Sequence, residues 1–383
     1  MVNISPSSKL NNVRYEIRGD LAKRAYELEK SGTQITHLNI GNPASYGLIA
    51  PDRLRMAMIE NISHCDAYTH QKGIFPAREA IIMQQQSRGI KNGSIDQVII
   101  GNGVSELIDI TLRALLENND EVLIPSPDYP LWTASTILNG GKAIHYPCKK
   151  ENSYIPDPAD IKKLITNKTR ALVLINPNNP TGNVLTSDEI DALLEISKKY
   201  PKCTIIADEI YDALDFTGKL CSVASRSKSS PVIVLNGVSK VYFAPGWRIG
   251  YMAWHDPEGR LELVRDGVER LLRSRLCAST PAQHGYLAGL TDEHDWLEGH
   301  RSRVKQRLDY CKDRISQIDG LECEAPGGAF YLFVRITDES VTSDKQWVLD
   351  LLHQQHVLVV HGSGFSPEFG SGHFRMRSED HTV

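Results

Sequence analysis

The sequence lacks the patterns that mark several classes of protein. Its 383 residues carry a formal net charge of −4, and acidic and basic residues are intermixed, so no basic face is implied. Apolar runs such as ALVLI and TIIA are far too short to span a bilayer. The first residues, MVNISPSSKL, contain no apolar stretch of the secretory-signal type. We therefore expect a cytoplasmic protein that binds neither nucleic acid nor membranes.

The cysteines and histidines also lack the spacings that are typical of disulfide frameworks and metal sites. The seven cysteines are odd in number and far apart, and no CxxC occurs among them. The thirteen histidines show no HExxH or comparable spacing. Reduced thiols are therefore expected, and neither a disulfide framework nor a metal site is predicted.

The chain is long enough for more than one folding unit, and its 41% hydrophobic content is ordinary for a globular protein. Strands and helices alternate from about residue 95 to 255, which predicts an α/β fold with a doubly wound, mixed but mostly parallel sheet. From about residue 320 the pattern changes to that of a smaller α+β unit. We expect a large domain over residues 46–290, and an N-terminal arm and small domain formed by residues 1–45 and 291–383.

One lysine stands in an unusual place. Lys240 comes shortly after the apolar strand PVIVL, just behind the small residues Gly237 and Ser239, and Arg248 comes eight residues later. Our hypothesis is that Lys240 bonds covalently to an aldehyde cofactor whose phosphate is held by Arg248. The alternative is a solvated lysine in a surface loop.

A second stretch, QVIIGNGVSELI, predicts an anion site. The strand breaks at Gly101 and Gly103, and a helix is expected to start at Val104 or Ser105. Free backbone N–H groups and the helix dipole then point at one spot. The third glycine of a dinucleotide fingerprint is missing, because Glu106 stands there, so phosphate binding is favoured over NAD binding.

Other candidates follow predicted strands, where the ligand residues of such a sheet gather. Asp208 ends the run TIIA, and a partly buried carboxylate needs a partner, such as a protonated ring nitrogen. Tyr129 and Trp132 are expected in a proline-rich loop after EVLI, either as core aromatics or stacked on a planar cofactor. Asn179 lies between prolines in NPNNPTG, in a plain turn or as an amide fixed for ligand recognition. Gly41, after HLNI, allows close approach of a ligand or serves an ordinary turn.

Together these stretches resemble the pyridoxal 5'-phosphate-dependent class I and II aminotransferases of fold type I. The resemblance covers nearly the whole chain and rests on NPNNPTG, ADEIY and SKVYFAPGWRIG in the family's order and spacing, with an arginine near the C-terminus. Within the family the chain is most similar to alanine (glutamate–pyruvate) aminotransferases, through VRYEIRG, LNIGNPA, IGNGVSELI, PSPDYPLWTA and LCASTPAQH.

The resemblance implies a role for each candidate. Lys240 would bond to the cofactor aldehyde, Asp208 would keep the pyridine nitrogen protonated, and Tyr211 with Asn179 would reach the phenolic oxygen. Tyr129 would stack on the ring. The residues implied to hold the phosphate are Gly103, Val104, Ser105, Ser239, Arg248 and, from the neighbouring subunit of a homodimer, Tyr68. The substrate α-carboxylate would bind Arg375, with help from Asn179 and the backbone of Gly41.

The family often has a hydroxyl residue three positions before the lysine, where this chain has Gly237, so we expect one phosphate hydrogen bond fewer. The implied reaction is a ping-pong exchange in which an amino acid leaves as its 2-oxo acid and a second oxo acid takes the amine. Lys240, as a free amine, would move the proton between the substrate and the cofactor.

The substrates are less well indicated. Alanine and 2-oxoglutarate are expected, with Tyr15 and Arg18 of the N-terminal arm lining the pocket, unless that arm is simply solvated. The alternatives are an aspartate or aromatic aminotransferase, or a β-lyase acting on a C–S bond. A regulator that senses amino acids on this fold is a further alternative, but the short, non-basic N-terminus leaves no room for an added DNA-binding domain.

Overall fold

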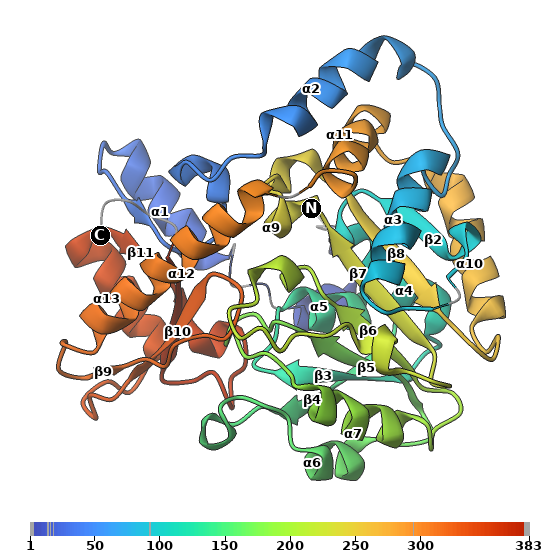
Figure 1. Ribbon diagram of the computed structural model, residues 1–383. Helices are drawn as coiled ribbons and strands as arrows, with labels where there is room; N and C mark the ends of the chain where they lie inside the picture. Colours follow the sequence, from blue (N-terminus) through green and yellow to red (C-terminus); the bar gives the residue numbers. More distant parts are fainter. Residues whose placement is uncertain are drawn as a thin grey trace.

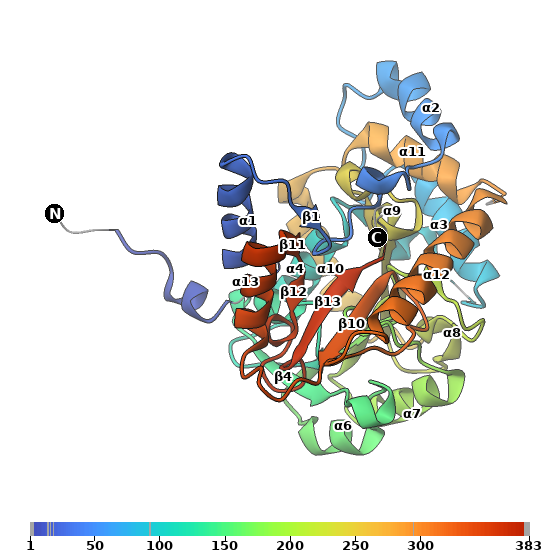
Figure 2. The same cartoon turned by 90° about the vertical axis from the view of Figure 1, so that its left-hand side faces the viewer.

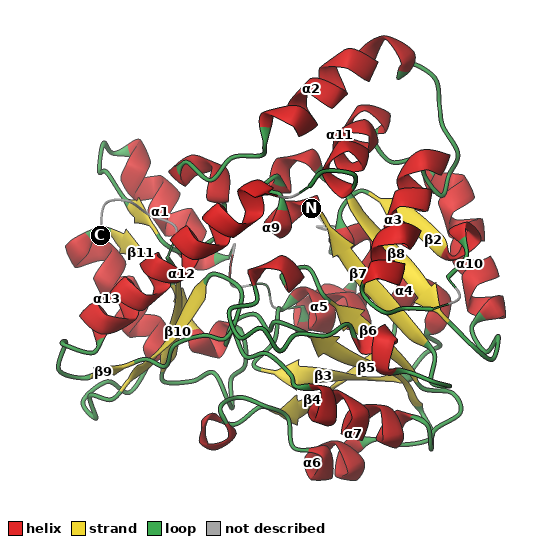
Figure 3. Ribbon diagram, viewed as in Figure 1, coloured by secondary structure: helices red, strands yellow, loops and turns green. Residues whose placement is uncertain are grey.

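The core of the protein is a mixed β-sheet. The computed structural model describes residues 4–13, 15, 17, 19–91, 93–293 and 295–378. Within these residues, seven strands pair in the order β2-β8-β7-β6-β5-β3-β4 (Figures 1 and 3). They are β2 (Val98–Gly101), β3 (Glu121–Ser126), β4 (Lys142–Pro147), β5 (Thr169–Ile175), β6 (Thr204–Asp208), β7 (Val232–Gly237) and β8 (Gly250–His255). Strand β8 runs antiparallel to both of its neighbours, β2 and β7, and the other pairs in this sheet are parallel, so the prediction of a mixed, mostly parallel sheet is confirmed.

The central strands are buried on both faces, as their continuous apolar runs predict. Alternate residues of β5, for example Leu172 and Val173, enter two different hydrophobic cores. One core contains side chains of α6 (Pro158–Leu164) and α7 (Ser187–Ser197). The other contains side chains of α4 (Val104–Leu115) and α10 (Glu262–Arg275), so helices cover both faces of the sheet.

The remaining helices of this part of the chain pack around the same sheet. They are α2 (Asp52–Asn61), α3 (Phe75–Ser87), α5 (Leu131–Leu138), α8 (Val223–Arg226), α9 (Val238–Val241) and α11 (Thr280–Leu290). Helix α2 stands out from the body and packs on α11 (Figure 1). A Cβ on Gly285 would come within 2.7 Å of Met58 Cγ, so the glycines of α11 permit this close packing.

A smaller antiparallel sheet forms from the C-terminal part of the chain. Its order is β12-β13-β10-β9, with β9 (Leu321–Glu322), β10 (Tyr331–Ile336), β12 (Val360–His361) and β13 (His373–Arg377). The helices beside it are α12 (Asp295–Ile315) and α13 (Asp344–Gln355). The N-terminal segment joins this part: β1 (Thr36–His37) pairs in parallel with β11 (Val357–Leu358), and α1 (Asp20–Lys30) shares a core with α13 (Figure 2).

One local prediction was wrong. Trp132 lies in the first turn of α5, not in a loop. Helix α10 begins at Glu262, after a turn in which the carboxylate of Asp256 accepts hydrogen bonds from the N–H groups of Arg260 and Leu261. Helix α11 was not expected, since its glycines weaken the helical pattern. Among the described residues, no helix is long and apolar enough to cross a membrane.

Candidate active site

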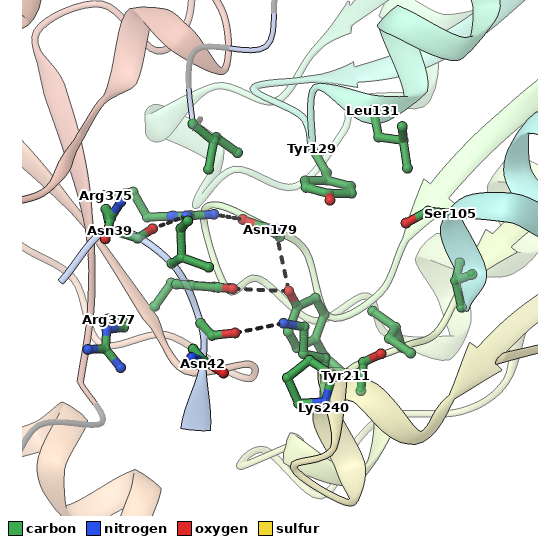
Figure 4. Close-up of a pocket in the computed structure, with 18 of the residues that line it drawn as sticks. Asn39, Asn42, Ser105, Tyr129, Leu131, Asn179, Tyr211, Lys240, Arg375 and Arg377 are labelled. Carbon is green, nitrogen blue, oxygen red and sulfur yellow. Dashed lines mark hydrogen bonds between the residues drawn. The ribbon is translucent and has the colours of Figure 1, made fainter. Parts of the chain in front are cut away.

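A cavity of about 1050 Å³ lies where the parallel strands end, facing the smaller sheet (Figure 4). It draws together residues from the whole length of the chain. Among the residues predicted from the sequence, those that line it are Tyr15, Gly41, Val104, Ser105, Tyr129, Asn179, Asp208, Tyr211, Ser239, Lys240, Arg248 and Arg375. Arg18 lies outside the described residues, and Tyr68 is not among the lining residues.

Lys240 sits in the short helix α9, directly after β7. Its Nζ donates a hydrogen bond to the Gly41 carbonyl over 3.1 Å and lies 5.5 Å from the centre of the Phe330 ring. The structure also explains Gly237. A Cβ there would come within 2.5 Å of the Ile249 carbonyl oxygen, because Gly237 pairs with Gly250 where β7 meets the start of β8. A hydroxyl residue has no space at position 237 in this chain.

The predicted anion site lies at the start of α4, which begins at Val104 as expected. Gly103 has φ +81°, and a Cβ on it would come within 2.5 Å of Arg248 Nη2. The Arg248 guanidinium donates to the carbonyls of Pro245 and Asn102, at 3.1 and 3.4 Å. A helix N-terminus, a guanidinium and the hydroxyls of Ser105 and Ser239 therefore border one part of the cavity, which we call the anion cradle.

Asp208, the last residue of β6, is 3% exposed. Its Oδ2 accepts a hydrogen bond from Trp132 Nε1 over 3.3 Å, and its Oδ1 accepts one from the Ile210 N–H over 3.4 Å. Burial raises the pKa of Asp208 to about 6, against the smaller effect of these two donors. No ion pair in the described part of the chain includes this carboxylate, so it lacks a cationic partner from the protein.

Buried polar side chains connect the large sheet to the smaller one. Arg375 Nη1 donates to Asn179 Oδ1 over 2.7 Å, and Asn179 Nδ2 donates to Tyr211 Oη over 3.4 Å (Figure 4). Tyr211 Oη in turn donates to Tyr331 Oη over 3.3 Å. Burial raises the pKa of Tyr211, and the Tyr331 hydroxyl adds to this effect, so Tyr211 stays a hydrogen-bond donor at neutral pH.

Arg375 is buried and sandwiched between rings. Its guanidinium carbon lies 4.2 Å from the centre of the Tyr331 ring and 4.7 Å from that of Phe365. Its Nη2 donates to the Asn39 carbonyl, while its buried Nε has no hydrogen-bond partner among the described residues. A fixed guanidinium with an unused donor suits a planar carboxylate ligand.

Two tyrosines close another side of the cavity. The hydroxyls of Tyr15 and Tyr129 lie 2.7 Å apart, and the two rings meet edge to face. This contact holds the N-terminal arm against the loop after β3, so Tyr15 is not solvated. Burial raises the pKa of Tyr129, with a smaller contribution from Tyr15, so the Tyr129 phenol remains protonated.

Tyr68 faces away from this cavity. Its side chain is 81% exposed, in the loop between α2 and α3. The loop itself is held in place, since Thr69 and Thr280 are hydrogen-bonded at 3.1 Å and Lys72 forms an ion pair of 2.6 Å with Glu269. An exposed aromatic on a fixed loop is available to another molecule.

Sequence reasoning missed four residues of the site. The carbonyl of Asn39 and the rings of Phe330, Tyr331 and Phe365 all contact Arg375 or Lys240. Trp132 was singled out only as a ring, yet its indole N–H binds Asp208. Phe330 and Tyr331 lie in the apolar run GGAFYLFV, which has the pattern of a core strand. The only signal was the pair of glycines before them.

Replacing Asp208 by asparagine is expected to stabilise the cofactor-free protein above pH 6. The pKa of Asp208 is raised on folding, so its favourable contribution is complete below about pH 4 and is lost as the pH rises through about 6. Asparagine stays neutral. The free energy of unfolding of the variant should therefore gain about 3 kcal/mol on the wild type between pH 4 and pH 8. Denaturant unfolding of both proteins measures this difference. If the free energies of unfolding of the two proteins changed with pH by the same amount, the prediction would be wrong.

Comparisons with known proteins agree with this geometry. The family model of aminotransferase class I and II matches residues 33–378. The glutamate-pyruvate aminotransferase of Haemophilus influenzae is 41% identical over 380 residues, which cover 97% of this chain and 92% of that protein. The alanine aminotransferase of Mycobacterium bovis is 40% identical over 373 residues, 94% of this chain and 85% of that protein.

Solved structures give the same picture. An alanine aminotransferase from Pyrococcus furiosus superposes with a TM-score of 0.95 at 40% identity, covering 98% of this chain and 95% of that chain. The aspartate aminotransferase of Rhizobium meliloti superposes with a TM-score of 0.90 at 25% identity, covering 99% of this chain and 96% of that chain.

Proposed function

Because the chain belongs to the class I and II aminotransferases, which depend on pyridoxal 5'-phosphate, we propose that it moves an amino group between alanine and 2-oxoglutarate. The products are pyruvate and glutamate. The observation that supports amino transfer most strongly is the meeting of Lys240, Asp208 and Arg375 in one cavity. The choice of alanine rests on the relatives with about 40% identity over most of both chains.

The cavity suits this cofactor in two respects. The buried Asp208 carboxylate lacks a cationic partner among the described residues, and a protonated pyridine nitrogen would supply one. In the anion cradle, a Cβ on Gly103 would come within 2.5 Å of Arg248 Nη2, so the glycine lets the cationic guanidinium lie directly against the start of α4. A ring with a nitrogen at one side and a phosphate at another therefore matches the donor set.

The proposed roles follow from these positions. Val104, Ser105, Ser239 and Arg248 hold the phosphate, with Gly103 keeping the cradle open. Tyr129 covers the ring, Asp208 holds the pyridine nitrogen protonated, and Tyr211 with Asn179 donates to the phenolic oxygen. The bound cofactor supplies the electron sink that makes the substrate α-hydrogen acidic.

Lys240 carries two proposed duties. It would be the covalent attachment point of the cofactor, and as a free amine it would move the proton at the substrate α-carbon. The Gly41 carbonyl, 3.1 Å from Nζ, holds this amine on the side of the N-terminal segment. Tyr211 stays protonated, so its one O–H, which donates to Tyr331 in this structure, can turn to donate to the phenolic oxygen.

Substrate recognition centres on Arg375. Its guanidinium binds the α-carboxylate, because Asn179 and the rings of Tyr331 and Phe365 fix its orientation. The backbone of Gly41 lies beside this carboxylate, where a Cβ would collide with Phe330 at 2.3 Å. Tyr15 and Arg18 are proposed to contact the substrate side chain.

An assay with purified protein tests the function. Alanine with 2-oxoglutarate should give pyruvate and glutamate with parallel double-reciprocal plots, and aspartate or aromatic donors should react more slowly. Faster turnover of those donors would replace the proposed substrate. Release of pyruvate and ammonia from a cysteine conjugate would indicate a β-lyase, and binding without turnover would indicate a regulator.

We further propose that residues 46–290 form the large domain and that residues 1–45 and 291–383 form the arm and small domain. The pairing of β1 with β11 supports this division. A cytoplasmic location is also proposed, supported by seven cysteines that are all unpaired.

The proposed oligomer is a homodimer with shared active sites. Exposed apolar side chains gather on α2, the short turn after it and the start of α3, and they include Met56, Ile59, Ile62 and Phe75. Tyr68, between α2 and α3, is proposed to reach the phosphate of the neighbouring subunit's cofactor. Such a patch is what a subunit interface covers.

Tyr68→Phe should raise the cofactor dissociation constant about tenfold, because one hydrogen bond to a charged phosphate is lost. The mass by sedimentation should stay that of a dimer. Tyr26→Phe, which alters another exposed tyrosine on α1, is the matched control and should change neither quantity. A monomeric wild type, or an unchanged dissociation constant in Tyr68→Phe, would contradict the shared site.

A further inference from the structure

Three charged side chains form a buried cluster behind the end of β6. Arg88, at the end of α3, donates from Nη2 to Glu209 Oε2 over 2.7 Å. Its Nη1 lies 3.1 Å from Asp212 Oδ2, as an ion pair without hydrogen-bond geometry. The Glu209 side chain is 2% exposed, and those of Arg88 and Asp212 are 19% and 15% exposed. None of the three lines the cavity.

Glu209 is held at both oxygens. Its Oε1 accepts hydrogen bonds of 2.9 Å from the Ser222 hydroxyl and the Val223 N–H, while Oε2 faces Arg88. Burial raises the pKa of Glu209, and Arg88 acts against this effect. Burial alone would lower the pKa of Arg88, but the carboxylates of Asp212 and Glu209 raise it, so the guanidinium stays charged.

This cluster lies directly under two site residues. Residues 208–212 form one turn, in which the Asp212 N–H donates to the Glu209 carbonyl over 3.0 Å. Asp208 and Tyr211 line the cavity, while Glu209 and Asp212 are directed to Arg88. The Arg88 guanidinium therefore contacts the turn at Glu209 and at Asp212, on the side of the turn that faces away from the cavity.

The Glu209 carboxylate also acts electrostatically on Asp208. Its charge adds to the burial that raises the pKa of Asp208. Arg88 neutralises part of that charge. Without Arg88, the buried Glu209 carboxylate would be left beside Asp208 without its cation, which is costly.

We propose that Arg88 is a positioning residue of the active site. By bridging Glu209 and Asp212 it holds the 208–212 turn, so that Asp208 and Tyr211 keep the orientation in which they meet the cofactor ring. The inference rests on the roles proposed above for Asp208 and Tyr211. It assigns no contact with the cofactor or substrate to Arg88 itself.

Arg88→Met removes the charge and keeps most of the apolar stem. The variant should bind the cofactor about tenfold more weakly, the equivalent of about 1.4 kcal/mol. The pH midpoint of the visible absorption of the lysine-bound cofactor should also shift, because that absorption responds to the groups at the ring nitrogen and the phenolic oxygen. Both are measured by absorption titration, with the thermal midpoint recorded alongside.

Arg170→Met is the matched control. Arg170 forms an ion pair of 3.2 Å with Asp120 and is 25% exposed. It lies near the start of β5, at the opposite end of the strands from the cavity. The Arg170→Met variant should lose stability without a change in cofactor affinity or in the pH midpoint of the absorption. If Arg88→Met behaves like this control, Arg88 has only a structural role and the proposal is wrong.

Two further variants keep the test decisive. In Arg88→Met/Glu209→Gln the thermal midpoint should recover more than the cofactor affinity, whereas full recovery of both would mean that Arg88 only neutralises a buried charge.

If Arg88→Met does not fold, Asp212→Asn frees one end of the bridge and should move the absorption midpoint in the same direction by a smaller amount; no movement would overturn the proposal. A wild type without the visible band would overturn the proposed function and this inference together, while an unchanged Arg88 variant beside a coloured wild type overturns the inference alone.

Discussion

Replacing Lys240 by alanine should abolish amino transfer and leave the fold intact. Lys240 is the only lysine among the described residues that line the cavity, so no other amine can take its place in proton transfer. Among the described residues its Nζ donates a hydrogen bond to the Gly41 carbonyl alone, so little stability depends on it. The half-reaction with alanine, followed by visible absorption, should fall by several orders of magnitude.

Lys219→Ala is the control, since Lys219 is exposed and lies in a loop outside the cavity. It should transfer the amino group at the wild-type rate. The thermal midpoints of both variants should stay near that of the wild type. A Lys240→Ala protein that still turned over near the wild-type rate would refute the proposed role of this lysine.

Asp208→Asn should slow the same half-reaction about 100-fold, or by about 3 kcal/mol in the barrier. Asparagine matches the shape of the carboxylate and can still accept from the Trp132 indole, so the packing is kept. What it cannot do is hold the pyridine nitrogen protonated. The rate constant with saturating alanine measures this effect directly.

Asp128→Asn tests whether any buried carboxylate would have the same effect. Asp128 is 2% exposed, and burial raises its pKa to about 8, but it does not line the cavity. Its substitution should leave the rate within about threefold of the wild type, the scatter expected for a site without direct contact. Equal losses in the two variants would show that the Asp208 charge is not specific to the reaction.

Local patterns in the chain were enough to predict the sheet and most strand ends. Runs such as VIVL and the IIA of β6 are apolar at every position, which is typical of strands covered on both faces. Their final residues then had to lie at one edge of the sheet, where Asp208 and Asn179 do meet the cavity. The start of α4 at Val104 followed from the glycine turn before it.

Contacts between distant segments could not be predicted in this way. The side chain of Arg375 meets the Asn39 carbonyl and Tyr331 because β13 pairs with β10 and the N-terminal segment lies beside them. Arg88 reaches Glu209 across 121 positions of the chain. Neither pairing has a local pattern, and helix α11 was missed because tertiary packing on α2 outweighs the low helical preference of its glycines.

The proposed covalent bond between the cofactor and Lys240 can be tested directly. Reducing the purified protein with borohydride should bleach its visible band and fix the cofactor to one lysine. Mass spectrometry of the digested protein should then find the added mass on the peptide that contains Lys240. Added mass on a different lysine, or a protein without a visible band and without any labelled peptide, would contradict the account.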